Sequence, residues 1–325
     1  MTKQGKSGAR GPGRSHREGL GLRELIRMFP DDETARAWFE SKLWPSGPFC
    51  PHCGSTSEQA DIKHKTMTHR CRDCPDKRMF SVRVGSVMEG SKLGYQTWAI
   101  AIYLTVTSLK SVSSMKLHRD LGVTQKTAWY LMHRLRKAFE EGRLAPFAGP
   151  TEVDETYVGG RKKRGTPGRG VKGKAVVAGA KDRVTKKVRA EAIPNTRKGT
   201  LQRFVVAHAE IGSLVYTDDH RSYLDMPWHH HEAVQHSVGE YVRGQINTNG
   251  IESFWSVLKR AHKGVFHKLS PKHLDRYVQE FAGKHNARES NTIEQMGQLA
   301  AGMAGKRLSY EDLIADNGLA SFARA

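Results

Sequence analysis

Apolar residues in the first half of the chain recur at helical spacing in two blocks. The first block runs from about residue 19 to residue 43; Asp31 or Asp32 can cap a helix within it, and Pro45 ends that helix. The second block runs from about residue 95 to residue 140 and stops at "EGRLAPFAGP". This Gly- and Pro-containing break predicts a domain boundary.

Beyond the break the pattern changes to short strands. Four segments have strand character: "TEVDETYVGG", "KAVVAGAKD", "KVRAEAIP" and "SLVYTDD". A helix-like segment, "KGTLQRFVVAHAE", separates the third from the fourth, and two helical segments follow, "NGIESFWSVLKRAHKG" and "SPKHLDRYVQEFAGKHNAR". This order predicts an α/β or α+β domain over residues 150–290. Residues 291–325 are weakly helical and are expected to form a C-terminal tail.

The charge of the chain points to a polyanionic partner. Its 325 residues, enough for two or three domains, contain 53 Lys and Arg against 33 Asp and Glu. A net charge of +20 favours nucleic acid, although a merely soluble basic protein or one on anionic membranes remains an alternative. No apolar run approaches the length of about 20 residues that spans a bilayer, so no membrane association is expected. Residues 1–18 are expected to be a disordered basic arm, either lying along phosphates or without a role.

All four cysteines fall in a segment with little helical periodicity. Cys50 and Cys53 form one C-x2-C pair, and Cys71 and Cys74 form another after 17 intervening residues. This spacing predicts a zinc ribbon, over residues 46–90, with a structural zinc ion held by four thiolates. Two disulfides are the alternative, but no secretion signal precedes the segment, and a cytoplasmic chain keeps its thiols reduced. Such a small module needs the metal for its folding.

Residues 91–145 have the character of a helix-turn-helix DNA-binding domain. Ser111 or Ser113 can cap a first helix, Gly122 provides the turn and Thr124 caps a second helix. A plain helical packing unit is the alternative. In the DNA-binding reading, the residues near base edges or phosphates are Gln125, Lys126, Thr127, His133, Arg134, Arg136 and Lys137.

A second basic segment lies between the first two strands. The loop "RKKRGTPGRGVKGK" carries seven Lys and Arg and is either a solvated hairpin loop or a clamp on DNA. Its candidate DNA-binding residues are Arg161, Lys162, Lys163 and Arg164.

Three widely separated acids complete the pattern. Asp154 lies in the first strand, Asp218 ends the fourth strand, and Glu252 lies on the following helix with Lys259 two turns later on the same face. An acid after a strand is commonly a turn former, but together these three can converge. Because clustered carboxylates repel one another, convergence indicates a divalent cation, Mg²⁺ or Mn²⁺. Such cations activate a water or a 3′-hydroxyl for attack at phosphorus, and Lys259 could hold a DNA phosphate beside them.

The chain resembles bacterial insertion-sequence transposases of the DDE superfamily, of the group with an N-terminal zinc ribbon and an ISXO-like catalytic domain. The resemblance covers about residues 25–290 and rests on "CPHCGS", "FSVRVGSVMEGSKL", "LGVTQKTAWYLMHRLR", "VDETYVGG", "YTDDHRSY" and "NTNGIESFWSVLKR". It implies Asp154, Asp218 and Glu252 as catalytic metal ligands. Asn249 is a rival or a helper of Glu252, because some related enzymes use Asn as the third residue.

The resemblance also implies the whole architecture and activity. The expected fold class is α/β: an RNase H-like catalytic domain, with a mixed sheet and flanking helices, preceded by the zinc ribbon and the helix-turn-helix. The expected protein is a cytoplasmic, nucleoid-associated bacterial transposase that binds terminal inverted repeats, cleaves and transfers DNA strands, and works as a homodimer or higher homo-oligomer. The alternative is a DNA-binding regulator or an inactive transposase descendant. The expected domains, besides the arm, are 19–45 (helical), 46–90, 91–145, 150–290 and 291–325.

Overall fold

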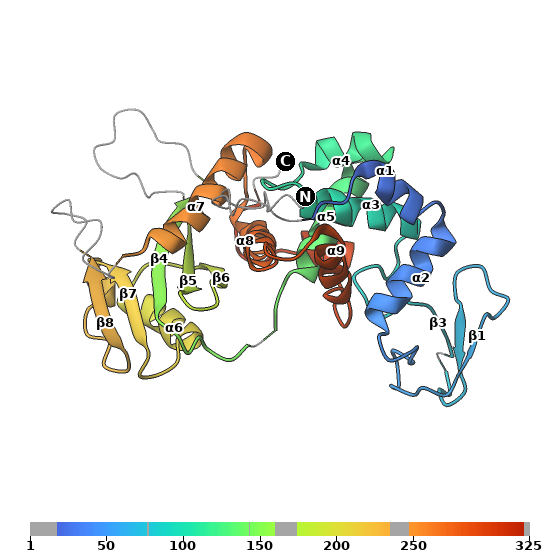
Figure 1. The fold of residues 1–325 in the computed structure, drawn as a ribbon, viewed down its shortest axis with the longest axis horizontal. Coiled ribbons are helices and arrows are strands. Elements are labelled where there is room, and N and C mark those ends of the chain that lie inside the picture. Colours follow the sequence, from blue (N-terminus) through green and yellow to red (C-terminus); the bar gives the residue numbers. More distant parts are fainter. Residues whose placement is uncertain (1–17, 77, 143, 160–173, 235–246, 322–325) are drawn as a thin grey trace, which may run out of the picture.

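The N-terminal half forms helices and a small three-stranded sheet (Figure 1). The computed structural model describes residues 18–76, 78–142, 144–159, 174–234 and 247–321. The elements of this half are α1 (Leu22–Met28), α2 (Asp32–Leu43), β1 (Glu58–Ala60), β2 (His69–Cys71), β3 (Met79–Phe80), α3 (Tyr95–Thr107), α4 (Ser114–Leu121) and α5 (Gln125–Ala138).

Helix boundaries in this half follow the capping residues. Asp31 caps α2, because its side chain accepts the backbone N–H of Thr34, and α2 ends at Leu43, just before Pro45. Ser113 caps α4 and Thr124 caps α5 in the same way. Gly122, between α4 and α5, takes a left-handed conformation that favours glycine, so the turn follows the local sequence.

One hydrophobic core joins the helices and strands β2 and β3 of this half to a segment near the C-terminus. Helix α9 (Thr292–Ala301) packs against α2, α3 and α5 and buries Met296, Leu299 and Ala300 in that core. Within the segment expected to be a C-terminal tail, α9 lies in the N-terminal core, and α10 (Tyr310–Ile314) follows it. The apolar face of α9 covers helices that precede it by more than 150 residues.

A five-stranded mixed sheet forms the second body. Its strand order is β6-β5-β4-β7-β8; β5 is antiparallel to both of its neighbours, and β4, β7 and β8 are mutually parallel. The strands are β4 (Thr151–Val158), β5 (Ala175–Asp182), β6 (Val188–Ile193), β7 (Leu214–Asp218) and β8 (His230–Val234). The four strands expected from the sequence are present. The fifth, β8, is polar and was missed.

Helices cover both faces of this sheet (Figure 1). On one face α7 (Asn249–Ala261) and α8 (Pro271–Asn286) form a core with Val177 and Val188. On the other face α6 (Lys198–His208) forms a core with Val153 and Val215. The expected mixed sheet with flanking helices is therefore found.

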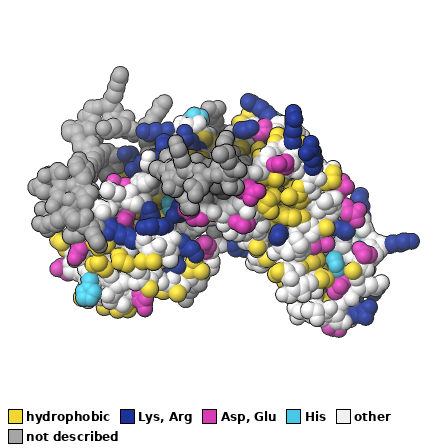
Figure 2. Space-filling model, in the orientation of Figure 1, with side chains coloured by type: hydrophobic (Ala, Val, Ile, Leu, Met, Phe, Trp, Pro, Cys, Tyr) yellow, Lys and Arg dark blue, Asp and Glu magenta, His cyan; other side chains and the backbone are white. Residues whose placement is uncertain are grey.

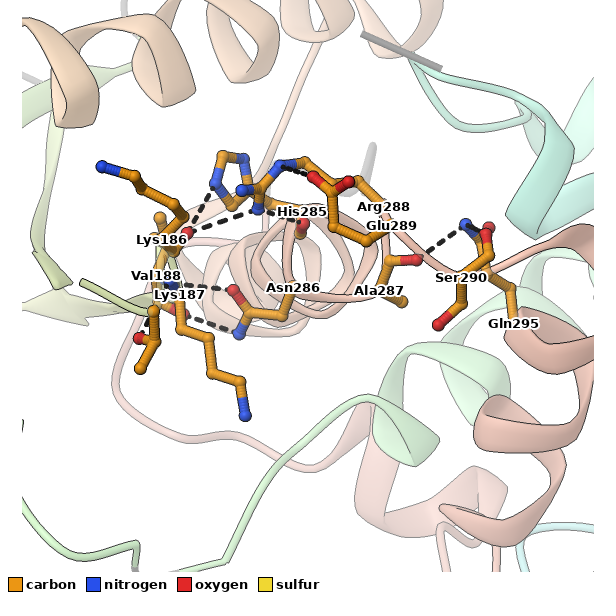
Figure 3. A network of polar contacts seen from close by, with 11 residues as sticks. Lys186, Lys187, Val188, His285, Asn286, Ala287, Arg288, Glu289, Ser290 and Gln295 are labelled. Atoms are coloured by element: carbon orange, nitrogen blue, oxygen red, sulfur yellow. Dashed lines mark hydrogen bonds and ion pairs between the residues drawn. The ribbon is translucent and has the colours of Figure 1, made fainter. Parts of the chain in front are cut away.

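Helix α8 connects the two bodies. At its C-terminal end, Asn286 exchanges hydrogen bonds with the backbone of Val188 in β6, at 2.7 and 2.9 Å (Figure 3). Beyond that end, Gln295 of α9 donates to the carbonyls of Ala287 and Ser290. Helix α8 and the turn after it thus contact both the sheet and the N-terminal core.

Buried charges join the middle of α8 to α5. Glu280 is fully buried; it accepts a hydrogen bond from Arg136 at 3.0 Å and lies 3.5 Å from Lys284. The Arg136 guanidinium also lies over the ring of Tyr277, 3.9 Å from its centroid.

The burial of α5 corrects part of the DNA-contact prediction. His133, Arg134 and Arg136 are all buried, so they do not form a phosphate-facing surface. Arg136 is paired with Glu280, and Arg134 donates to the carbonyl of Glu89 and the hydroxyl of Tyr130. These residues were predicted to lie near DNA phosphates, but Arg134 and Arg136 instead bind internal partners on distant segments, Glu89 and Glu280. Within the described residues, no helix is long and apolar enough to cross a membrane.

The charge cluster on α8 generates a stability prediction. Replacing Glu280 by Ala leaves Arg136 and Lys284 buried without their carboxylate, which should lower the free energy of unfolding by about 3–5 kcal/mol. Glu289→Ala is the matched control, because that carboxylate is exposed and pairs with Arg288 at the surface. Chemical denaturation followed by circular dichroism measures both. If both variants lowered the free energy of unfolding equally and only slightly, the buried charge cluster would not stabilise the fold as predicted.

Candidate active site and zinc centre

Alternation along β4 sends successive side chains to opposite faces of the sheet. Glu152 and Asp154 contact α7, through Ile251 and Trp255 respectively. Val153 lies in the core beneath α6, and Glu155 accepts a hydrogen bond from Tyr223 on that same side, at 2.7 Å. One strand therefore presents Asp154 to the α7 face.

The carboxyl group of Asp154 is half-buried and lies near two other carboxyl groups. Its Oδ2 accepts a hydrogen bond from the indole N–H of Trp255 at 2.9 Å. Burial, and then the negative charges of Glu155 and Asp218, raise the pKa of Asp154 to about 8, although the Trp255 hydrogen bond acts in the opposite direction. A nearby cation would favour the ionised form, so this position fits a metal ligand.

Asp218 lies at the end of β7, which pairs in parallel with β4. It is half-buried, and its Oδ1 accepts the backbone N–H of His220 at 3.1 Å. Its charge contributes to the raised pKa of both Asp154 and Glu155, so the three carboxyl groups are electrostatic neighbours. Asp219, the next residue, is exposed.

Glu252 and Lys259 face the same pocket as Asp154. A cavity of about 430 Å³ is lined by these three residues and by Glu155, Thr156, Trp255, Ser256, Arg260 and Lys263. Glu252 is exposed on the first turn of α7, and Lys259 lies on its last turn. Asn249, the alternative third residue, is exposed at the first position of α7 and does not line this cavity.

Asp154 and Glu252 line this cavity, Asp218 does not, and the three carboxylates do not form a closed ligand set. Among the described residues, only the four cysteines bring three or more His, Cys, Asp or Glu ligand atoms within 4.8 Å of one another. Carboxylates repel one another, so drawing Asp154, Asp218 and Glu252 to ligand distances requires a cation between them.

A buried carboxylate fixes the start of α7, a feature that the sequence did not reveal. Glu152 Oε2 accepts the backbone N–H of Ile251 at 2.9 Å, and its Oε1 accepts from Arg183 Nε at 2.8 Å. It thereby caps a helix whose N-cap residue, Thr248, makes no side-chain cap. A Cβ on Gly250 would lie 2.6 Å from Glu152 Oε2, so glycine allows this close approach. The only sequence signals were Gly250 and an acid on the same strand face as Asp154.

The four cysteines form a compact cluster. Cys50 Sγ lies 3.5 Å from Cys74 Sγ, Cys53 Sγ lies 3.6 Å from Cys71 Sγ, and all four are free thiols. Burial tends to raise the pKa of Cys50, but backbone N–H groups of His52 and Cys53 lower it to about 7, whereas the neighbouring thiol of Cys53 and burial raise the pKa of Cys74. This donor set fits a closed structural zinc site.

Aromatic packing attaches the zinc module to α2. The Trp44 ring lies edge-on to His69 and Phe80, which stack on each other with centroids 5.3 Å apart. The nearby His69 is therefore used for packing. Trp44, directly after α2, supplies apolar packing to the zinc module. We therefore expect the fold of the module to depend on both the metal and this aromatic contact.

The predicted DNA-facing residues at the start of α5 remain at the surface. Gln125 and Lys126 are exposed; Gln125 bonds to Ser114, and Lys126 lies over the ring of Tyr310. Thr127 is half-buried and bonds to Thr124, and Lys137 pairs with Glu140. Arg161, Lys162, Lys163 and Arg164 lie outside the described residues.

The cysteine cluster predicts a zinc-dependent fold. Purified protein should contain about one zinc ion per chain, and removing it with a chelator should unfold the ribbon and lower the thermal midpoint. Elemental analysis and thermal denaturation measure these effects, with Cys74→Ser as the variant and the exposed Ser57→Ala as a control. A zinc-free protein with an unchanged midpoint would contradict the assignment.

Known proteins match the chain in both regions. The ISXO2-like transposase domain matches residues 146–286, and the transposase zinc-ribbon domain matches residues 30–77. A protein in transposable element ISH50 of Halobacterium salinarum is 27% identical over 261 residues, covering 74% of this chain and 87% of the relative. A transposase-like protein of Haemophilus influenzae is 31% identical over 119 residues, covering 36% of this chain and 95% of the relative. With its sheet, its cysteine cluster and these matches, the chain belongs to the family of ISXO2-like transposases with a zinc ribbon.

Proposed function

We propose that the chain is an active transposase that binds terminal inverted repeats and cleaves and transfers DNA strands in a metal-dependent reaction. The observation that carries this proposal is the pocket beside β4. Asp154 and Glu252 line it together with Lys259, and the charge of Asp218 acts on Asp154. An acidic centre beside cationic side chains suits a phosphodiester substrate.

The sheet supports an RNase H-like assignment for the catalytic domain. Three consecutive antiparallel strands, β4, β5 and β6, are followed by β7 and β8, which add in parallel on the other side of β4. This arrangement carries Asp154 on the central strand and Asp218 on its parallel neighbour. The two acids thus come from adjacent strands, and α7 supplies the third.

In the proposed reaction Asp154, Asp218 and Glu252 would hold Mg²⁺ or Mn²⁺. The bound metal would polarise the attacking water or 3′-hydroxyl and stabilise the leaving oxygen. Lys259, Arg260 and Lys263 bind phosphate oxygens of the strand in the pocket, which positions the scissile phosphate. Asn249 is at most a helper, because it does not line the pocket.

DNA end recognition is assigned to the N-terminal body. In this proposal α4 and α5, which are joined by the turn at Gly122, act as the helix-turn-helix, and the exposed Gln125 and Lys126 at the start of α5 face the DNA. The surface of the other body also suits DNA binding, because Figure 2 shows Lys and Arg side chains gathered on the visible face of the sheet-bearing body. Holding two transposon ends together calls for a homodimer or higher homo-oligomer.

A non-catalytic DNA-binding protein is the second candidate. It is favoured by one observation: the three carboxylates are not gathered to ligand distances. The two candidates differ in whether added Mg²⁺ or Mn²⁺ produces strand breaks.

The proposal predicts the effect of neutralising one acid. Asp154→Asn should reduce Mn²⁺-dependent nicking of DNA bearing the element's ends at least about 100-fold, because a metal ligand is lost, while DNA binding changes by less than about twofold. Asp225→Asn is the control, since Asp225 is exposed and pairs with Lys198 away from the pocket. Gel analysis of nicked products and of DNA binding measures both quantities. If the parent binds the ends but never nicks them, the regulator is the better account.

A further inference from the structure

Trp255 makes a polar contact that its role in the core does not require. Its side chain is 2% exposed and packs with Phe254 in the core under α7. Its only polar atom, Nε1, donates to Oδ2 of Asp154 at 2.9 Å. A buried indole N–H needs an acceptor, and here the acceptor is the acid on the central strand.

The sheet leaves a space for this indole. Gly179 of β5 stands directly opposite Asp154 in the β4–β5 pairing. A Cβ at Gly179 would lie 2.6 Å from Cζ2 and 2.7 Å from Cη2 of Trp255, closer than side-chain atoms pack. Its φ is not in the left-handed region, so the backbone itself does not demand glycine. Glycine within a strand usually marks such a close approach.

The two features together restrict the carboxyl group of Asp154. The Trp255 N–H occupies one lone pair of Oδ2, and the ring lies against the strand on the side that Gly179 leaves open. The hydrogen bond therefore restrains the rotation of the carboxyl group through Oδ2. Partners that orient a metal ligand in this way commonly change metal affinity by 10- to 100-fold.

We propose that Trp255 is a positioning residue that presents Oδ1 of Asp154 to the divalent cation, with Gly179 providing the room for its ring. This inference rests on the proposed function, in which Asp154 binds the cation. It goes beyond that function because it gives Trp255 and Gly179 a role in metal affinity rather than in packing alone.

The test removes the N–H while retaining most of the ring. Trp255→Phe in the full-length, zinc-loaded protein should weaken Mn²⁺ binding about tenfold in calorimetry. The Mn²⁺ concentration for half-maximal nicking should rise by the same factor, and saturating Mn²⁺ should restore most of the parental rate. Loss of packing alone would instead lower the thermal midpoint and leave the Mn²⁺ affinity of the folded fraction unchanged.

Two further variants make the result decisive. Gly179→Ala displaces the ring from the opposite side and should weaken Mn²⁺ binding to a similar degree, so it decides the question if Trp255→Phe does not fold. Trp228→Phe is the matched control, because this half-exposed indole lies outside the pocket and its loss should leave Mn²⁺ binding unchanged.

The outcomes distinguish failure of this inference from failure of the proposed function on which it rests. If the parent binds Mn²⁺ and nicks DNA, but folded Trp255→Phe and Gly179→Ala bind Mn²⁺ equally well, only the positioning role is wrong. If the parent neither binds Mn²⁺ nor nicks DNA, the proposed function fails and this inference fails with it.

Discussion

The attachment of α7 to β4 is the constraint on which the rest of the site depends. Glu152 binds the backbone at the start of α7, and one turn later Trp255 binds Asp154. Gly250 and Gly179 permit these two close approaches. Because both contacts come from the same face of one strand, the helix cannot slide or rotate without losing a buried hydrogen bond. Glu252 and Lys259 are therefore held beside Asp154 by the fold itself.

Charge is distributed so that an acidic centre lies within a basic molecule. The chain carries a net charge of +20, yet burial and like charges raise the pKa of Asp154 to about 8. A divalent cation would relieve this repulsion, and Lys259, Arg260 and Lys263 line the same cavity. Charge pairing also explains why not all basic residues of α5 can contact DNA, because Arg136 is buried in an ion pair with Glu280. Surface cations can attract DNA, whereas buried ones connect α5 to the sheet-bearing body through α8.

Local patterns in the sequence predicted those helices, caps and cysteine pairs that depend only on residues close together in the chain. The sequence pattern identified α7 as a helix, caps located α2 and α5, and cysteine spacing located the cysteine cluster. Contacts between distant segments were not predictable. The burial of Arg136 depends on Glu280, 144 residues away, and the position of α9 depends on a core formed by the N-terminal helices. The Glu152 cap had only Gly250 and an acid on the same strand face as Asp154 as its signals, and β8 is too polar to show strand alternation.

The most direct test of the central claim is a crystal structure of the full-length protein soaked with Mn²⁺, read from its anomalous difference map. The account predicts a manganese peak coordinated by carboxylate oxygens of Asp154, Asp218 and Glu252, with the Trp255 hydrogen bond to Asp154 intact. A peak on other ligands, or no peak beside β4 in protein that nicks DNA with Mn²⁺, would contradict it.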